Sequence, residues 1–420
     1  MKVVIMAGGR GTRISCIASD IPKPMIKIEG KPVLEHEIKC LNKQGFKDII
    51  ITVSHLGNTI IDYFGDGTKF GVNIEYFFEK DPLGNAGALF KLKDKLKEDF
   101  LLLNADSVFD IDFNRFVEFH KHKGGLVTLF THPNSHPYDS GLIIANNEGA
   151  VLQWLAKEDE RPVYYRNRVN AGLHVISPKV LDVEVTTSIV DLDRQILKPL
   201  AGTGKMFVYD SPEYVKDMGT PDRYETVIKD FREGIVQNRN LQKKQKAIFI
   251  DRDGTINKYV GFLCNINDFE LLDGVSEAIK KINNSGYLAI VVTNQPVIAR
   301  GEVTWDELNE IHKKMETLLG EKGAYLDGIY YCPHHPHKGY AGEISELKIN
   351  CDCRKPKPGM LLKAAEDFNI DLSLSWMVGD GENDILCGKN AGCKTAYIGQ
   401  NLNADICGKD LLDNINQILV

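Results

Sequence analysis

The sequence lacks the features that mark membrane, secreted or nucleic-acid-binding proteins. No apolar run approaches the length of a bilayer-spanning helix. No long run of lysine and arginine occurs in a chain whose net charge is −7. We therefore expect neither a membrane nor nucleic acid as a partner. The N-terminal stretch MKVVIMAGG has too short an apolar run for a signal peptide, so we expect a cytoplasmic protein.

Cysteine is too scarce and too scattered for a disulfide framework. The 420 residues contain nine cysteines, and only Cys332, Cys351 and Cys353 cluster. Such a cluster suggests a metal site. An apolar content of 43% and a charged content of 26% are typical of a soluble globular protein, and the length predicts two or three domains.

A glycine-rich loop at residues 7–13 follows a predicted strand at residues 2–6. It has neither the third glycine of a dinucleotide fingerprint nor the Gly-Lys-Ser/Thr of a Walker loop. Its backbone N–H groups can still wrap a triphosphate, and Arg13 can neutralise the phosphate charge. In the phrase Ile-Pro-Lys-Pro-Met at residues 21–25, two prolines fix the backbone around Lys23, so its ammonium group can be aimed.

Together, the loop with Arg13 and the Pro-Lys-Pro-Met phrase resemble the sugar-1-phosphate nucleotidyltransferase family over roughly residues 1–232. The resemblance implies a Rossmann-like domain with a mixed sheet. In the implied reaction, a sugar 1-phosphate oxygen attacks the α-phosphorus of a nucleoside triphosphate and pyrophosphate leaves. Asp106 and Asp217 would hold Mg²⁺, while Arg13 and Lys23 offset the developing charge.

The same resemblance implies a set of substrate-binding residues. Residues 79–88 resemble the base-binding loop, and Asp193 stands where many relatives carry a sugar-binding glutamate, which leaves the identity of the sugar open. Plain turn chemistry is the alternative for the segments around Gly141 and Asn170. The residues implied to bind substrate are Gly8, Gly9, Gly11, Thr12, Gly84, Gly141, Asn170 and Asp193.

The second half opens on an apolar strand at residues 247–250, which ends in Asp251 and Asp253. Ligands of open α/β sheets bind at the carboxyl ends of strands. Two carboxylates at such an end can hold a hard cation and attack a phosphate, although a strand-end turn is the alternative. Three further phrases follow in order: Thr-Asn-Gln at 293–295, Arg-Lys-Pro at 354–356, and Val-Gly-Asp at 378–380.

This ordered set resembles the phosphatases of the haloacid dehalogenase superfamily. The resemblance implies that Asp251 is the nucleophile and forms an aspartyl phosphate, while Asp253 protonates the leaving oxygen and then activates water. Further residues receive roles on the same basis. Thr293 and Lys355 would hold the phosphoryl group, Asn294 would contact the substrate, and Asp251, the carbonyl of Asp253 and Asp380 would bind Mg²⁺.

Cys332, His334, Cys351 and Cys353 make a complete Cys₃His set for a tetrahedral Zn²⁺ site. His335 and His337 are rival ligands, and free cysteines with surface histidines are the alternative. A structural zinc would pin the loop that leads into Arg354 and Lys355, and so shape substrate choice.

With the cysteine loop, the second half looks like the D-glycero-D-manno-heptose 1,7-bisphosphate phosphatases and the related histidinol phosphatases. Arg354 could then grip a second phosphate bidentately. Pro296 and Val297 replace the small residues usual after Thr-Asn-Gln, and Gly381 replaces a common lysine. Because of both departures, the sequence does not specify how the distal end of the substrate is bound.

We therefore expect a bifunctional enzyme with a transferase domain at residues 1–235, a linker at 236–245 and a phosphatase domain at 246–420. The phosphatase would convert heptose 1,7-bisphosphate to heptose 1-phosphate, and the transferase would join that product to a nucleoside triphosphate, with GTP favoured. One alternative pairs a mannose or glucose 1-phosphate transferase with a histidinol phosphatase. Another makes the first half a nucleotide-sugar sensor. The sequence specifies neither the base nor whether the chain forms a homo-oligomer.

Overall fold

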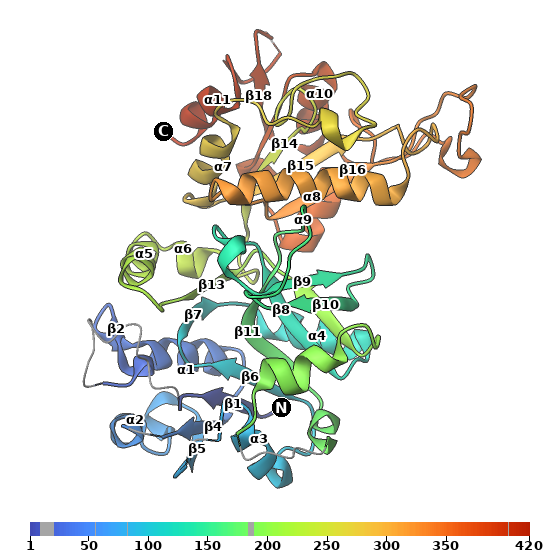
Figure 1. The fold of residues 1–420 in the computed structure, drawn as a ribbon. Coiled ribbons are helices and arrows are strands. Elements are labelled where there is room, and N and C mark those ends of the chain that lie inside the picture. Colours follow the sequence, from blue (N-terminus) through green and yellow to red (C-terminus); the bar gives the residue numbers. More distant parts are fainter. Residues whose placement is uncertain (9–20, 55, 82, 184–188, 402) are drawn as a thin grey trace. The chain divides into compact units, whose positions relative to one another are not determined.

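The computed structural model describes residues 1–8, 21–54, 56–81, 83–183, 189–401 and 403–420 (Figure 1). These residues form two compact units, each considered by itself below. The first unit comprises Met1–His132, Gly141–Ala156 and Asn170–Asn240, and the second comprises Pro133–Ser140, Lys157–Val169 and Leu241–Val420. The sequence-based domain limits stay a prediction. None of the helices in these ranges is long and apolar enough to cross a membrane.

A nine-stranded sheet with both parallel and antiparallel pairs forms the first unit. The central strand β1 (Val3–Met6) runs parallel to β4 (Asp48–Val53) and β6 (Phe100–Asn104), while β11 (Val169–Ile176) runs antiparallel to β6. This arrangement confirms the predicted mixed sheet. Its other strands are β5 (Asn73–Phe78), β8 (Val127–His132), β9 (Leu142–Ala145), β10 (Val151–Leu155) and β12 (Met206–Asp210).

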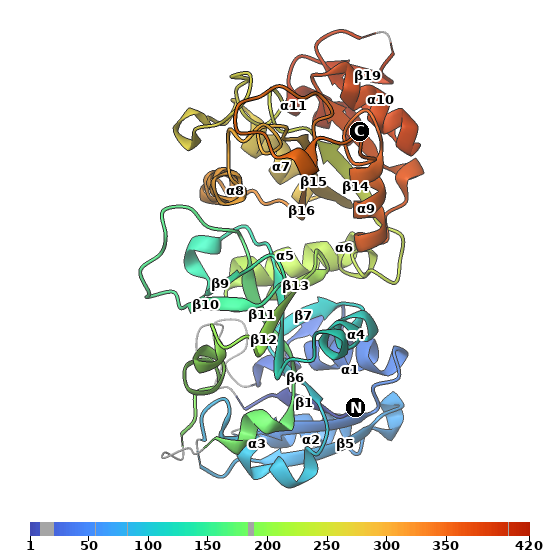
Figure 2. The ribbon, with the colours of Figure 1, turned by 90° about the vertical axis from the view of Figure 1, so that its right-hand side faces the viewer.

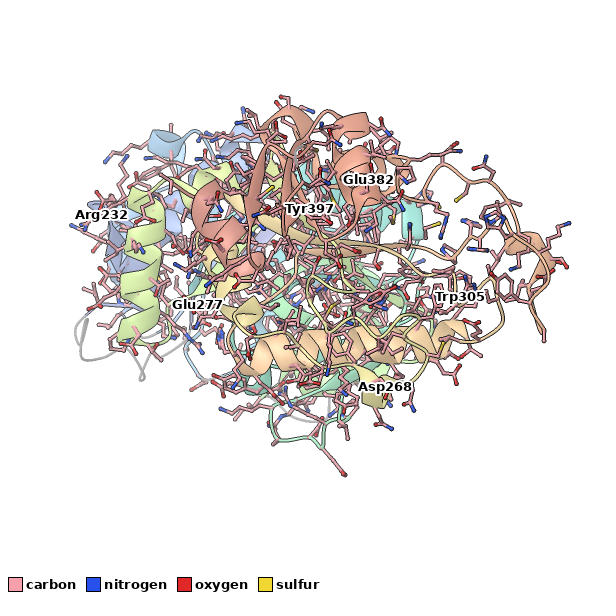
Figure 3. All side chains as sticks on the ribbon, turned by 90° about the horizontal axis from the view of Figure 1, so that it is seen from above. Arg232, Asp268, Glu277, Trp305, Glu382 and Tyr397 are labelled. Carbon is pink, nitrogen blue, oxygen red and sulfur yellow. The ribbon has the colours of Figure 1, made fainter. Side chains whose placement is uncertain are left out.

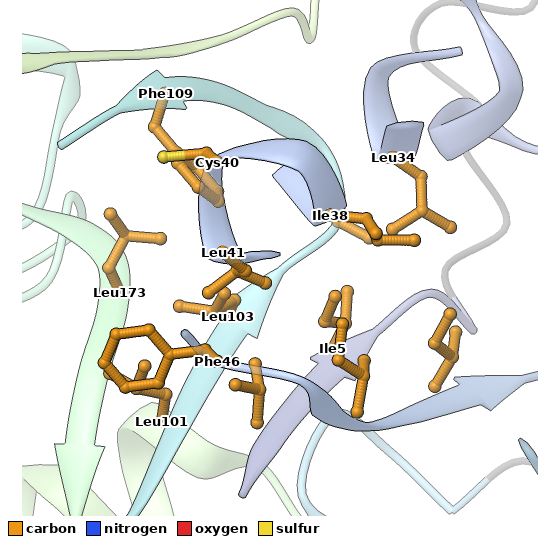
Figure 4. Packing of buried hydrophobic residues seen from close by; sticks show 14 of the residues in the cluster. Ile5, Leu34, Ile38, Cys40, Leu41, Phe46, Leu101, Leu103, Phe109 and Leu173 are labelled. Atoms are coloured by element: carbon orange, nitrogen blue, oxygen red, sulfur yellow. The ribbon is translucent and has the colours of Figure 1, made fainter. Parts of the chain in front are cut away.

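Both faces of this sheet are covered, because alternate residues of a strand point to opposite faces. Ile5 belongs to a core that includes residues of α1 (Val33–Lys43), α2 (Gly57–Phe64) and α4 (Phe113–Lys123), whereas Val4 belongs to the core that includes residues of α3 (Gly87–Lys91). Figure 4 shows Leu34, Ile38 and Leu41 of α1 above the strand residues Ile5 and Leu103. Smaller elements complete the unit: β2 (Lys27–Ile28), β3 (Lys31–Pro32), β7 (Ser107–Asp110), β13 (Tyr214–Asp217), α5 (Pro221–Arg232) and α6 (Ile235–Asn238).

The second unit is built on a six-stranded, wholly parallel sheet. Its strand order is β16 (Gly328–Cys332), β15 (Tyr287–Asn294), β14 (Lys246–Ile250), β17 (Trp376–Gly379), β18 (Lys394–Ile398) and β19 (Ile406–Gly408). The first strand, β14, therefore lies between β15 and β17. Because all the strands are parallel, the carboxyl ends of these three neighbours meet at one edge of the sheet, where ligands bind in such folds.

Helices cover both faces of the parallel sheet (Figure 2). One core packs α7 (Val275–Asn283), α8 (Trp305–Glu321) and α11 (Leu411–Ile418) on Ile248 and Ile250. The other core packs α9 (Gly359–Phe368) on Phe249 and includes Cys387 of α10 (Glu382–Ala391). Figure 3 labels Trp305 and Glu382 at the starts of α8 and α10. The arrangement confirms the predicted α/β phosphatase fold.

Two segments from the middle of the first half belong to the second unit. They are held on α8, where the backbone N–H of Tyr165 donates to Thr317 Oγ1 at 2.9 Å and Arg168 NH1 donates to Glu316 Oε1 at 3.3 Å. A methyl group added at Gly320 would lie 2.8 Å from the ring of Pro137. The close approach explains why a glycine suits this point of the helix.

Candidate active sites and a candidate metal centre

A cavity of about 520 Å³ lies at the carboxyl ends of β1, β4 and β6 in the first unit. Four residues predicted from the sequence line it, namely Gly8, Lys23, Gly84 and Asp106. The other lining residues are Met6, Ala7, Pro24, Thr52, Ser54, Glu79, Lys80, Asp81, Leu83, Asn85, Asn104 and Ala105. Four further predicted residues lie outside the described residues: Gly9, Gly11, Thr12 and Arg13.

The two predicted metal-binding acids of this unit lie near each other through strand pairing. Asp217 pairs with Ser107 in the β13–β7 ladder, and the backbone N–H of Met218 donates to the carbonyl of Asp106 at 3.4 Å. Each carboxylate already has a cationic partner: Lys23 Nζ lies 3.3 Å from Asp106, and Arg223 NH1 lies 2.9 and 2.8 Å from the oxygens of Asp217. Of the two acids, Asp106 lines the cavity and Asp217 does not.

The predicted base-binding loop is fastened to the segment that carries Asp193. Gly84 has a φ of +76°, and a methyl group there would lie 2.3 Å from the carbonyl oxygen of Val190, so only glycine fits. The N–H of Leu192 donates to Asn85 Oδ1 at 2.7 Å. Burial raises the pKa of Asp193 to about 6, with a further contribution from Asp191. The predicted sugar-binding residues Asp193, Gly141 and Asn170 are not among the residues that line the cavity.

Asn170 lies on β11, where its Oδ1 accepts from the N–H of Gly172 at 3.2 Å and contacts His174 Nε2 at 3.1 Å. Burial lowers the pKa of His174 to about 3, so the ring is neutral and donates from Nε2. The contact fixes the orientation of the Asn170 amide.

In the second unit, Lys355 connects the predicted catalytic groups. Its Nζ lies 2.7 Å from Asp251 Oδ1, 2.6 Å from Asp384 Oδ1 and 2.9 Å from the carbonyl of Val292. Asn294 holds the Lys355 backbone from both sides, accepting from its N–H at 3.0 Å and donating to its carbonyl at 3.1 Å. The structure therefore brings together the ends of β14 and β15 and the predicted Arg-Lys-Pro phrase.

Three carboxylates gather beside Lys355. One oxygen from each of Asp251, Asp380 and Asp384 lies within 4.8 Å of the others. Burial and then the nearby Asp384 raise the pKa of Asp251 to about 7, against the effect of Lys355. Burial and then Asp384 also raise the pKa of Asp380. Clustered oxygen ligands and mutual repulsion suit a hard cation such as Mg²⁺, which would relieve that repulsion.

Asp384 is a site residue to which the sequence assigned no role. Its position follows from the first turn of α10, where the N–H of Gly381 donates to Asp384 Oδ2 at 3.0 Å. Two glycines make room for the carboxylates: a methyl group on Gly254 would lie 2.1 Å from Asp380 Oδ2, and one on Gly379 would lie 2.2 Å from Asp384 Oδ2.

The side chain of Asp253 is held by a separate network. Arg252 NH2 lies 2.9 Å from both of its oxygens, and Gln295 Nε2 donates to it at 2.9 Å. Gln295 also donates to Thr293 Oγ1 at 2.8 Å, so one amide orients both predicted catalytic groups. Arg252 is fully buried and contacts His312 Nε2 at 3.3 Å. Burial and then Arg252 hold the pKa of His312 well below its usual range.

Sequence reasoning gave no role to Arg252 or His312. Arg252 carried a signal, because an arginine between two strand-end acids is placed to pair with one of them. His312 lies far along the chain on α8, and no local pattern connects it with Arg252.

The predicted zinc ligands form one cluster. Cys353 Sγ lies 3.2 Å from Cys332 Sγ, 3.3 Å from Cys351 Sγ and 3.3 Å from His334 Nδ1. Donors ~2.3 Å from a tetrahedral Zn²⁺ would lie ~3.8 Å apart, so the donors would have to move apart by only about half an ångström to reach that geometry. The pKa of Cys353 is lowered to about 5, and its hydrogen bond with Cys332 is the largest cause.

The rival ligands are not part of this cluster. His335 Nδ1 contacts the carbonyl of His337 at 3.3 Å, and its ring packs on Tyr340. Arg354, which follows Cys353, donates from NH1 to the carbonyl of His334 at 3.2 Å. The two halves of the cysteine loop are thereby joined beside Lys355.

Comparison with known proteins gives matches in both halves. Residues 2–234 match the nucleotidyl transferase family, and residues 352–406 match the HAD-hydrolase-like family. A D-glycero-beta-D-manno-heptose-1,7-bisphosphate 7-phosphatase of Pasteurella multocida is 46% identical over 154 residues, which cover 37% of this chain and 81% of the relative. The Escherichia coli K12 protein of the same name is 45% identical over 145 residues, covering 34% and 74%.

One solved structure, from Bacillus anthracis, is described as a glucose-1-phosphate thymidylyltransferase. It aligns with a TM-score of 0.51 and 19% identity over 56% of this chain and 96% of its own. At that identity the likeness shows the fold alone.

The raised pKa of Asp251 predicts that the metal-free protein loses stability as the pH rises from about 4 to about 7. The unfolded chain releases this proton near 3.8 and the folded chain near 7. The folded state therefore binds more protons throughout the window, and each pH unit lowers the free energy of unfolding by up to about 1.4 kcal/mol. Asp251→Asn should flatten this slope in chemical denaturation with EDTA present. Glu366→Gln, at an exposed position of α9, is the control, and equal slopes in the two variants would contradict the prediction.

Proposed function

Because the chain belongs both to the nucleotidyl transferase family and to a family of heptose bisphosphate phosphatases, we propose that its two enzyme activities process one heptose in sequence. The first membership rests on residues 2–234. The second rests on 154 residues that match the D-glycero-beta-D-manno-heptose-1,7-bisphosphate 7-phosphatases. The phosphatase removes the 7-phosphate of heptose 1,7-bisphosphate. The transferase joins the remaining 1-phosphate to GTP and gives GDP-heptose and pyrophosphate. The observation that carries the proposal is chemical: a sugar 1-phosphate is the product of one family and the substrate of the other.

In the phosphatase reaction, an oxygen of Asp251 attacks the phosphorus and the bond from phosphorus to the sugar oxygen breaks. Asp253 gives that oxygen its proton and then takes one from the water that hydrolyses the aspartyl phosphate. The contact of Lys355 with Asp251 supports a role in holding the phosphoryl group, and the hydrogen bond from Gln295 to Thr293 Oγ1 supports the same role for Thr293. Mg²⁺ held by Asp251, Asp380 and the carbonyl of Asp253 would neutralise negative charge on the attacking and transferred groups.

In the transferase reaction, the sugar 1-phosphate oxygen attacks the α-phosphorus directly, so no protein nucleophile is needed. Lys23 lines the cavity beside Asp106, which supports its role in offsetting charge on the phosphates. Arg13 is assigned the same role by the sequence. Mg²⁺ held by Asp106 and Asp217 would bind the triphosphate and stabilise the leaving pyrophosphate.

Neither step changes a bond to the anomeric carbon of the heptose. One step cleaves the phosphate at the far end of the sugar, and the other forms a bond at phosphorus. The anomer of the bisphosphate is therefore the anomer of the sugar nucleotide. The names of the relatives specify the β-anomer, and the sequence does not specify the anomer that this chain uses, so both anomers belong in the assay.

Glu79 supports the assignment of GTP. It lines the cavity, and an oxygen of its carboxyl lies 3.4 Å from the position of a methyl group on Gly8. Burial raises the pKa of Glu79 from its usual value. A carboxylate accepts two parallel N–H donors, and guanine offers such a pair on its Watson–Crick edge through its ring imino and exocyclic amino groups. Adenine, cytosine and thymine lack that pair.

We assign the Cys₃His cluster to a structural Zn²⁺. Its four donors are those of closed structural zinc sites. The cluster directly precedes Arg354 and Lys355, so an ion bound there would anchor the chain on which the Lys355 ammonium depends. We therefore propose that the ion orders the loop and helps to position the substrate, and that it takes no part in bond breaking.

The central prediction separates the two activities by mutation. Asp251→Asn removes the nucleophile, so phosphate release from heptose 1,7-bisphosphate should fall at least a thousandfold, while nucleotidyl transfer from supplied heptose 1-phosphate stays within about twofold. Mass spectrometry of products with each triphosphate measures both. Histidinol phosphate and the 1-phosphates of mannose and glucose are the competing substrates. Release from histidinol phosphate alone, or loss of both activities in the variant, would contradict the proposal.

A second prediction concerns the base. Glu79→Gln replaces one accepting oxygen by an amide donor, so kcat/KM for GTP should fall about tenfold to a hundredfold while that for ATP changes little or rises. Asp62→Asn changes an exposed acid of α2 that does not line the cavity and is the matched control. Equal loss with every triphosphate would show that Glu79 does not read the base.

A third prediction concerns the metal cluster. The purified protein should contain zinc in a one-to-one ratio, and Cys351→Ser should lower that content while Cys264→Ser, an exposed cysteine outside the cluster, does not. Without zinc, the Michaelis constant of the phosphatase should rise and the transferase should be unchanged. Full zinc content in the Cys351 variant would rule out this ligand set.

A further inference from the structure

The side chain that holds Asp253 depends on a histidine from a distant helix. Arg252 has no exposure, and its NH2 group lies 2.9 Å from both oxygens of Asp253. Its NH1 group lies 3.3 Å from Nε2 of His312, which is on α8 and is 2% exposed. Burial and then Arg252 hold the pKa of His312 well below its usual range, so the ring is neutral. Because a guanidinium group offers only donors, Nε2 accepts from NH1.

A buried acid follows His312 by one turn of α8. Residues four apart on a helix lie on one face, so Glu316 lies on the face of α8 that carries His312. Two arginines pair with its carboxylate: Arg168 NH1 lies 3.3 Å from Oε1, and Arg166 Nε contacts Oε2. Arg166 also acts electrostatically on the ring of His312. One connected group of side chains therefore leads from these two arginines to the residue that holds Asp253.

The two arginines come from residues 157–169, a segment of the first half of the sequence that belongs to the second unit. Its backbone is fastened to α8 at Tyr165, whose N–H donates to Thr317 Oγ1 at 2.9 Å and whose carbonyl accepts from the same hydroxyl at 3.3 Å. Asn167 has no exposure and exchanges hydrogen bonds of 3.1 and 2.7 Å with Asn134. Buried polar groups that satisfy one another hold a chain in one conformation. The segment therefore has a fixed conformation where it meets α8.

We propose that residues 157–169 are a positioning element of the phosphatase. The paired arginines of this segment fix the face of α8 from which His312 reaches Arg252. Arg252 in turn holds Asp253 where it gives and takes the proton of the reaction. The inference rests on the proposed phosphatase function, in which Asp253 is the general acid and base, and extends it to residues that act through Asp253. A segment within the match to the transferase family thereby supports catalysis by the phosphatase.

The leaving group determines how much the position of Asp253 matters. A sugar alkoxide is a strong base, so its bond to phosphorus breaks readily only when Asp253 supplies a proton. The p-nitrophenolate ion is a much weaker base and leaves without one. A displaced Asp253 therefore slows the first step with heptose 1,7-bisphosphate but not with p-nitrophenyl phosphate, whereas a general loss of structure slows both. Because hydrolysis of the aspartyl phosphate needs Asp253 with either substrate, the first turnover is the informative measurement.

The test follows the first turnover in the full-length, metal-loaded protein. His312→Phe keeps a ring and removes the acceptor, and Arg166→Gln removes one arginine of the segment. For heptose 1,7-bisphosphate, the maximal rate constant should fall about tenfold to a hundredfold in His312→Phe and about threefold to tenfold in Arg166→Gln. The substrate concentration that gives half of the maximal rate should stay within about threefold. With p-nitrophenyl phosphate, the release of nitrophenol should stay within about twofold.

His312→Gln retains an acceptor and should recover most of the rate. Glu160→Gln, at an exposed position of the segment, is the control and should match the wild type. Equal loss with both substrates would overturn the positioning role, as would wild-type rates in His312→Phe or in Arg166→Gln. Thermal unfolding identifies a variant that fails to fold, in which case the other variant decides.

A separate outcome would concern the proposed function itself. If the wild type does not hydrolyse heptose 1,7-bisphosphate, that function fails, and the positioning role is judged on histidinol phosphate, whose leaving group is also an alkoxide. A selective loss with histidinol phosphate in the two variants would support the role. Hydrolysis of neither alkyl phosphate by the wild type would overturn both proposals.

Discussion

The ammonium group of Lys355 is the interaction on which the second unit depends. Burial works against its charge, but Asp251 and Asp384 overcome that effect and raise the pKa of Lys355 above its usual value. The lysine reaches them because Asn294 bonds its backbone on both sides. Removing either carboxylate partner would leave a buried charge with less compensation, which is a large penalty in an apolar interior. The strand ends, the loop after the cysteine cluster and the start of α10 are therefore positioned together.

Parallel strand order explains why the sequence predicted so much of this site. Asp251, Thr293 and Asp380 each follow an apolar run, and such runs are recognised locally. Once the runs pair in parallel, their carboxyl ends must share one edge, whatever the loops do. The strand predicted at residues 2–6 is observed as β1 (Val3–Met6), and the apolar strand predicted at residues 247–250 lies within β14 (Lys246–Ile250).

What the sequence could not predict depends on contacts between distant residues. The side chain of Asp253 turns to Arg252 and Gln295 because the buried guanidinium needs partners, and His312 joins them only through the packing of α8 on the sheet. Asp384 enters the carboxylate cluster through the angle at which α10 begins. The attachment of residues 157–169 to α8 likewise rests on Thr317 and Glu316, which are about 150 positions away in sequence and leave no periodic signal.

The charges of the second unit are unbalanced in opposite directions in two adjacent regions. Asp251, Asp380 and Asp384 surround one lysine and leave an excess of negative charge. Among the described residues, Arg300 has no carboxylate partner and Lys348 has Glu343 alone, which leaves an excess of positive charge. A bound cation and one phosphate would balance the first region. The cation has to be present first, because a phosphate alone would add negative charge to a region in which three carboxylates already surround one lysine.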